Sequence, residues 1–192
     1  MSDSVATVAP PARQRILDSA YELFSRRGIR GVGVDEVIER ADVARATLYR
    51  HFRTKDDLVL AFLELREQLW THDAVEAEAR RRGSTPEERL LAIFDVFDDW
   101  FGRDDFEACS FINVLLELGP EHRAGKACIV HLENIRTVVR TLAEEAGLSR
   151  PEEFARSWHI LMKGSIVQAT EGDRDAAKRA KSMARLLIDQ HR

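Results

Sequence analysis

Cysteines, long apolar runs and a secretion signal are what this sequence lacks, and each shortage excludes a class of protein. Its two cysteines, Cys109 and Cys128, are too few for a disulfide framework and do not have the spacing of metal ligands. The longest apolar stretches, such as LVLAFL, fall well short of the roughly 18–20 residues that a membrane-spanning helix needs. The opening segment MSDSVATVAPPA has neither the basic nor the apolar part of a secretion signal. We therefore expect a cytoplasmic protein with reduced cysteines and no membrane partner.

The signatures of common enzymes are missing as well. The six histidines are scattered, and the sequence contains no HExxH motif, no glycine-rich phosphate loop and no nucleophile elbow. Adjacent acidic residues such as Glu144 and Glu145 fall at the ends of predicted helices, where helix capping and hydration explain them. The sequence thus predicts no catalytic residues, no metal and no cofactor.

Charge is distributed unevenly along a chain whose net charge is −4. The segment that ends at Arg53 has nine basic and seven acidic residues, whereas the remainder has 20 basic and 26 acidic residues. A mildly basic head on an acidic body is the pattern expected when only the head contacts a polyanion such as DNA.

Apolar residues recur at helical spacing almost throughout, and no run alternates for long enough to form a strand. Near the N-terminus, Ile16, Ala20 and Phe24 form such a stripe, and Gly28 follows as a stop signal. A capping box with proline in the first turn opens another helix at Thr85. The prediction is an all-α fold of about nine helices, with a disordered tail over residues 1–10, a three-helix head over 11–53 and a helical body over 54–192.

The most informative stretch lies in the head and has the pattern of a helix-turn-helix. Two short amphipathic helices are predicted, from Val34 to Arg40 and from Ala44 to His51. Between them, Asp42 is tolerated where a left-handed residue is needed, and a valine fills the angle. The second helix then turns Leu48 inward and leaves a polar and aromatic face directed away from the core.

That outward face suits a DNA groove. Arg45 lies near the start of the second helix, where base edges are met, and its guanidinium can pair with guanine. The methyl groups of Ala46 and Thr47 match the methyl group of thymine, and the Thr47 hydroxyl can reach a base edge or a phosphate. Phenol, imidazole and ammonium groups suit phosphates, while Arg50 can contact either target. The predicted DNA-binding residues are Arg45, Ala46, Thr47, Tyr49, Arg50, His51 and Lys55.

Four short motifs characterise the head, namely Tyr21-x-Leu23-Phe24 with Gly28, Ala41-x-Val43, Thr47-Leu48-Tyr49-x-x-Phe52 and Lys55-Asp56-Asp57-Leu58. With these motifs, the head resembles the DNA-binding domain of the TetR family of transcriptional regulators over roughly residues 12 to 60. Gly33, Asp42, Ala44 and Ala46 depart from the residues usual in the family, which makes the operator sequence harder to infer. Each departure weakens a helix cap or a turn by at most about 0.3–1 kcal/mol.

The resemblance implies a homodimer that binds a pseudo-palindromic DNA operator and responds to a small-molecule effector. Repression, relieved when the effector binds, is the expected mode. The effector would enter the helical body, although the aromatic residues there are more often core than pocket. The effector-binding residues that this interpretation suggests are Phe97, Trp100, Phe111, Asn113, Trp158 and Met162.

Dimerisation is expected to use the last two helices, as in the four-helix interface of the family. Small residues there allow close approach, and larger apolar residues supply buried area. The predicted interface residues are Trp158, Met162, Ser165, Ala169, Ala180, Met183 and Leu187.

Two alternatives stay open at this point. One is a transcriptional activator of the same family, because the sign of regulation depends on where the operator lies relative to a promoter. The other is a small-molecule-binding helical protein whose head has no DNA role.

Overall fold

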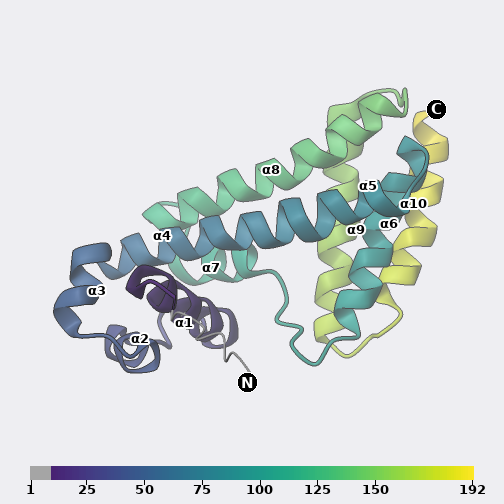
Figure 1. The fold of residues 1–192 in the computed structure, drawn as a ribbon. Helices are drawn as coiled ribbons and strands as arrows, with labels where there is room; N and C mark the ends of the chain where they lie inside the picture. Colours follow the sequence, from purple (N-terminus) through teal and green to yellow (C-terminus); the bar gives the residue numbers. More distant parts are fainter. Residues whose placement is uncertain (1–9) are drawn as a thin grey trace, which may run out of the picture. The chain divides into compact units, whose positions relative to one another are not determined.

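The computed structural model describes residues 10–192, and every regular element in that range is a helix (Figure 1). The predicted all-α fold is therefore confirmed. The chain forms two compact units, of which the first ends at Phe62 and the second runs from Leu63 to Arg192. The predicted tail over residues 1–10 falls almost wholly outside the described residues.

The helices of the first unit are short and are followed by one long helical stretch that crosses the boundary between the units. If this stretch is counted as one helix, residues 10–192 contain nine helices. The first unit contains α1 (Ala12–Arg27), α2 (Val34–Ala41), α3 (Arg45–His51) and the first two turns of α4 (Lys55–Arg66). The long stretch continues from α4 through the π-helical segment η1 (Glu67–Ala77) into α5 (Glu78–Arg82). The second unit adds α6 (Pro86–Phe101), α7 (Ser110–Leu118), α8 (Arg123–Glu145), α9 (Pro151–Thr170) and α10 (Ala176–His191).

A small apolar core holds the first unit together. Ile16, Val37 and Leu48, one from each of the three short helices, are buried completely or almost so. Phe62 from α4 joins them, and its ring contacts Phe24 edge-to-face with a centroid distance of 5.6 Å. Burying a side chain of this size contributes about 1.5–3 kcal/mol, so this core fixes how α3 is presented.

Reciprocal caps start the helices where the sequence predicts. Thr54 and Asp57 exchange hydrogen bonds at the start of α4, because each side chain accepts from the other residue's backbone N–H at 3.1 Å. Thr85 and Glu88 make the same exchange at the start of α6, at 3.2 and 3.1 Å. The capping box predicted at Thr85 is therefore confirmed.

Aromatic side chains dominate the core of the second unit. α6 packs against α5, α8 and α10, and α9 packs against α8 and α10. Trp70 from η1 stacks on Phe97 of α6 with a centroid distance of 5.9 Å, and Trp158 of α9 lies 5.2 Å from Phe94. These contacts connect η1, α6 and α9 through one continuous apolar cluster.

A polar cluster ties the first turn of η1 to α8. The Glu67 carboxylate accepts a hydrogen bond from the side-chain amide of Asn134 at 2.6 Å and shares another with His131 Nδ1 at 2.6 Å. The ring of Phe111 from α7 stacks on His131 with a centroid distance of 5.1 Å. A π-helical stretch within a longer helix often marks a functional position, and here one end of it is anchored to the body of the unit.

Candidate DNA-binding site

The corner between α2 and α3 has the backbone geometry that the sequence predicts. Asp42 ends α2 in the left-handed region, with φ 50° and ψ 58°, so that prediction is confirmed. The N–H of Asp42 bonds to the carbonyl of Glu39 at 3.2 Å, and that of Val43 bonds to the carbonyl of Ile38 at 3.3 Å. These bonds satisfy the last carbonyl groups of α2 and turn the chain directly into α3.

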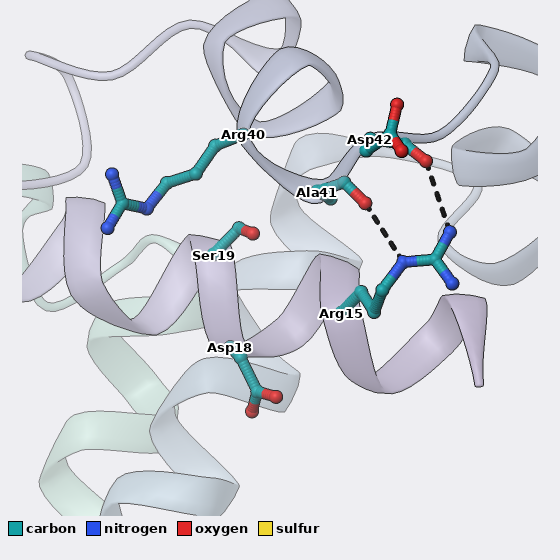
Figure 2. A pocket seen from close by; sticks show the side chains of 6 residues that line it. All are labelled: Arg15, Asp18, Ser19, Arg40, Ala41 and Asp42. Atoms are coloured by element: carbon teal, nitrogen blue, oxygen red, sulfur yellow. Dashed lines mark hydrogen bonds between the residues drawn. The ribbon is translucent and has the colours of Figure 1, made fainter. Parts of the chain in front are cut away.

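Arg15 of α1 holds this corner in place, a role that the sequence did not reveal. Figure 2 shows its guanidinium directed at the corner, where Nε donates to the carbonyl of Ala41 at 3.0 Å and Nη2 donates to that of Asp42 at 3.1 Å. Beside it, Arg40 of α2 forms an ion pair with Glu22 of α1. No short motif marks an arginine in the first turn of an amphipathic helix as a clamp, because its partners lie 26 and 27 residues further along the chain.

α3 presents the predicted outward face. Leu48 points into the core, while Thr47 is half-buried and Tyr49 is 41% exposed. The remaining predicted contact residues on this helix are also exposed, namely Arg45, Ala46, Arg50 and His51. Apart from half-buried Thr47, the predicted contact residues on α3 are therefore accessible, and their contacts with DNA remain a prediction.

One charged contact joins α3 to α2 on this surface. The guanidinium of Arg45 forms an ion pair with the carboxylate of Asp35, which lies in the first turn of α2. Sequence reasoning missed Asp35, since ten residues and a turn separate the two side chains.

Lys55 differs from the other predicted contacts, because the head itself uses its ammonium group. Its Nζ donates to the carbonyl oxygens of Ile29 and Val32 at 2.5 and 2.6 Å, and it lies 6.0 Å from the centre of the Phe24 ring. Two of its three N–H donors therefore hold the loop between α1 and α2. The ammonium group of Lys55 is therefore engaged within the head, and we expect it to contribute little to phosphate binding.

The start of α2 compensates for the absence of a serine or threonine cap. Gly33 supplies no side chain, but the Glu36 carboxylate accepts from its N–H at 3.0 Å. Arg27 of α1 also donates to Glu36, and this hydrogen bond holds the pKa of the Glu36 carboxyl below its ordinary value. Although Gly33 departs from the family pattern, its backbone N–H is still hydrogen-bonded, because the side chain of Glu36 caps the start of the helix.

The residues suggested for effector binding divide into two groups. Phe97, Trp100, Phe111, Trp158 and Met162 are all buried in the second unit. Asn113 on α7 is exposed, so it is not buried with the others, and its role in effector binding stays a prediction.

Sequence reasoning also missed buried polar groups in the second unit. Thr71 Oγ1, Ser110 Oγ and Trp158 Nε1 have no hydrogen-bond partner among the described residues, and each of these residues is at least nine-tenths buried. An unpaired buried polar group costs about 1–3 kcal/mol, so these three atoms are unusual positions in the core of the second unit.

The residues predicted for the dimer interface differ in burial. Trp158, Met162, Ser165 and Ala180 are at most 6% exposed within the single chain. Side chains that their own chain covers offer little surface to a second subunit, so we do not expect these four residues to form the centre of an interface. α9 is apolar on two faces, and sequence periodicity does not tell which of them the chain buries. Ala169 and Leu187 are half-buried and Met183 is exposed, so these three remain available.

The described residues form neither a metal site nor a membrane span. No group of three or more histidine, cysteine, aspartate or glutamate side chains there could hold a metal ion. None of the helices in that range is long and apolar enough to cross a membrane.

Together, the clamped corner, the inward Leu48 and the exposed face of α3 are the features of a helix-turn-helix transcription regulator. Residues 16–62 match the family model described as bacterial regulatory proteins, tetR family. Residues 16–62 are thus a TetR-family DNA-binding domain, and the chain is similar to DNA-binding transcriptional regulators of that family.

Comparisons along the whole chain agree with this assignment. The HTH-type transcriptional regulator AcrR of Shigella flexneri is 23% identical over 205 residues, covering 95% of this chain and 90% of AcrR. The crystal structure of a TetR-family transcriptional regulator from Streptomyces coelicolor superposes with a TM-score of 0.85 at 27% identity, covering 94% and 95% of the two chains. Identity reaches 42% with the regulator YvkB of Bacillus subtilis, but over 53 residues and 28% of each chain.

Proposed function

We propose that this protein is a homodimeric regulator that binds a pseudo-palindromic operator through α3 of each subunit and is released by a small-molecule effector. The observation that carries the proposal is the exposed face of α3, which is held on a buried Leu48 and a corner clamped by Arg15. A helix presented in this way enters the major groove, and two such helices in a dimer enter successive grooves about 34–36 Å apart.

Some side chains of α3 are proposed to contact bases, and others to contact phosphates. Arg45 reads a guanine through its guanidinium, and Ala46 and Thr47 meet a thymine methyl group. Tyr49 and His51 donate to phosphates, which fix the position of the helix along the duplex. Arg50 contacts either a base or a phosphate.

Replacing Arg45 separates a base contact from a phosphate contact. If Arg45 reads a base, Arg45→Ala weakens binding to the operator by about 1–3 kcal/mol and relaxes the preference at one base pair. If Arg45 instead holds a phosphate, the same change weakens binding to all sequences alike and lowers the salt dependence by about one charge. Titrations with the operator and its single-base variants at two salt concentrations distinguish the two roles.

Dimerisation would use the outer faces of α9 and α10. Ile160 and Val167 on α9 are 72% and 55% exposed, and Met183 and Leu186 on α10 are 56% and 70% exposed. Between the two residues on α9, a Cβ added at Gly164 would meet no atom within 4 Å. A strip of large apolar side chains around a backbone with open space allows another helix to approach closely, which supports these faces as the site of the second subunit.

The effector is expected to act on the second unit and on the long helical stretch that leaves the head. Buried Thr71, Ser110 and Trp158 offer unpaired polar groups to a ligand, and Thr71 lies within η1 itself. A ligand that binds there would bias η1, and α4 carries the change along the chain to the head. Effector and operator then oppose each other by a coupling of typically 1–3 kcal/mol. If a saturating effector leaves operator affinity unchanged, this mechanism is wrong.

Repression in the cytoplasm is the mode proposed here, as is typical of the family. A dimer bound over a promoter blocks transcription until the effector releases it. An operator placed upstream of a promoter would instead favour activation, and a protein without operator binding would favour a purely small-molecule-binding role.

Retention of genomic DNA tests the proposal. The purified protein is incubated with fragmented DNA of its source genome, and the retained fragments are sequenced. We expect a few sites that share an inverted repeat, and the position of that repeat relative to promoters distinguishes repression from activation. The experiment is repeated at low and high salt, with and without metabolites made by enzymes that neighbouring genes encode. If no site is enriched under any of these conditions, the proposed function is wrong.

A further inference from the structure

We infer that Asp35 of α2 determines DNA specificity by fixing the guanidinium of Arg45 for base contact. The inference rests on the proposed function, in which α3 enters the major groove. It adds a second helix to the reading of the operator, because Asp35 lies on α2 and Arg45 on α3.

The ion pair between these two residues is the observation from which the inference starts. Nη2 of Arg45 contacts Oδ1 of Asp35, and both side chains remain largely exposed, at 62% and 72%. Both side chains are therefore accessible to DNA, with Arg45 in the first turn of α3. A guanidinium has five N–H donors, so a single contact with Asp35 leaves donors free for the two acceptors of a guanine edge.

Neighbouring carboxylates on α2 do not have this role. Glu36 is held by Arg27 and by the N–H of Gly33 at the start of its helix. For the carboxylate of Glu39, one turn after Asp35, no hydrogen bond or ion pair is found among residues 10–192. Asp35 is thus the α2 carboxylate that reaches across to α3, and Glu39 offers a matched control with the same charge.

Two physical effects of the pair favour reading a base over holding a phosphate. An exposed arginine has many rotamers, and a carboxylate that fixes the guanidinium removes part of the ordering cost of forming a two-bond contact. A carboxylate beside the guanidinium also repels phosphate oxygens, which opposes a purely electrostatic contact at that position. The pair therefore lowers affinity for DNA in general while it increases the difference between the correct and the incorrect base.

Comparing the variants Asp35→Asn and Glu39→Gln distinguishes two roles of Asp35: positioning the guanidinium of Arg45, and repelling DNA through its negative charge. Each variant removes one negative charge from α2 and keeps the size of the side chain, and both residues are exposed. Operator affinity is measured for the wild type and both variants, using the selected operator and all its single-base variants, and melting temperatures confirm folding. Both variants should bind unrelated DNA more tightly and by similar factors, because both lose a charge that repels phosphate.

Only Asp35→Asn should change the reading of the operator. We expect its discrimination at one base pair to fall by about three- to tenfold, a part of the roughly 5- to 150-fold that a two-bond arginine contact supplies. Glu39→Gln should keep the discrimination of the wild type. In an Arg45→Ala background, Asp35→Asn should have no further effect at that base pair, because the residue it positions is gone.

Three results would overturn the inference. The first is that Asp35→Asn and Glu39→Gln discriminate equally between base pairs. The second is that the effects of Asp35→Asn and Arg45→Ala at that base pair add independently. A wild-type protein that selects no DNA sequence would overturn the proposed function together with this inference, and that failure is recognised before any variant is tested.

Discussion

Replacing Arg15 with methionine tests how strongly α1 holds the corner of the helix-turn-helix. Methionine keeps much of the length and the apolar stem of the side chain, but it cannot donate to the carbonyl groups of Ala41 and Asp42. The corner then keeps only its own backbone bonds, and the angle between α2 and α3 is less firmly set. We expect weaker binding to the operator and faster local opening of α3.

The magnitude follows from the two bonds to the corner that are lost. A third bond, from Nη1 to the carbonyl of Pro10 at 3.2 Å, does not involve the corner. Hydrogen bonds from a charged donor contribute about 1.5–3 kcal/mol each when buried, and less where water reaches them. Arg15 is half-buried, and its bond to Asp42 is exposed to solvent. We therefore expect a loss of about 1–2 kcal/mol in the free energy of local opening, which corresponds to about 5- to 30-fold.

Hydrogen exchange measures this loss directly. The N–H of Phe52 bonds to the carbonyl of Leu48 at 2.8 Å and reports on the end of α3. Its exchange should accelerate about 5- to 30-fold in Arg15→Met. The control is Arg40→Met, which removes the same charge but only an exposed ion pair worth about 0–1 kcal/mol. If Arg15→Met accelerates exchange no more than Arg40→Met, the clamp does not hold the corner.

Three further predictions concern stability and assembly. Lys55→Met should destabilise the head by about 1.5–3 kcal/mol in urea unfolding, because the ammonium group of Lys55 donates to two backbone carbonyls. The same change should leave the salt dependence of DNA binding unchanged. A lower salt dependence would show that Lys55 contacts a phosphate. Burial lowers the pKa of His159 from 6.5 to about 3, and the nearby positive charges of Lys163 and Arg136 add to the effect. Below pH 6.5 the unfolded chain therefore binds a proton at His159 that the folded chain does not bind. Stability should therefore fall by up to about 2 kcal/mol between pH 7.5 and 5, and His159→Gln should remove this part of the loss in urea titrations at the two pH values; an equal loss in the variant would contradict the assignment. Ile160→Glu should give a monomer in light scattering, whereas Val130→Glu, at an apolar position on α8 that is 58% exposed, should remain a dimer; a dimer in both cases would place the interface elsewhere.

Local chemistry explains why much of the head could be predicted from sequence. Asp42 in a left-handed corner, Leu48 facing the core and the exposed face of α3 all follow from residues within a few positions of one another. The capping box at Thr85 is equally local. Short-range rules of this kind need no knowledge of the tertiary structure.

Long charged side chains are what the sequence could not place. Arg15, Asp35 and Lys55 all find partners on another helix or loop, between 10 and 27 residues away. Their direction depends on how the helices pack, which hydrophobic spacing does not specify. The same pattern therefore assigned Lys55 to phosphates and overlooked Arg15 and Asp35.

The burial of the two faces of α9 could not be predicted for a related reason. α9 has one apolar strip through Trp158 and Met162 and another through Ile160 and Val167, and both have helical spacing. The chain buries the strip that contains the tryptophan, and Trp158 then packs against Phe94 and Phe154. Only the tertiary structure shows that the second strip is left exposed.

Cleavage of DNA from a reagent attached beside α3 tests the central claim most directly. Cys109 and Cys128 are both buried, so a cysteine introduced at exposed Arg53, directly after Phe52, can be labelled selectively with an iron chelate. On the selected operator, the account predicts two clusters of cuts about 34–36 Å apart, one for each subunit of a dimer. The same label at exposed Gln190 on α10 serves as the control and should give no such pair. Cuts that are scattered along the DNA, or that are the same from both positions, would contradict the conclusion that α3 reads the operator.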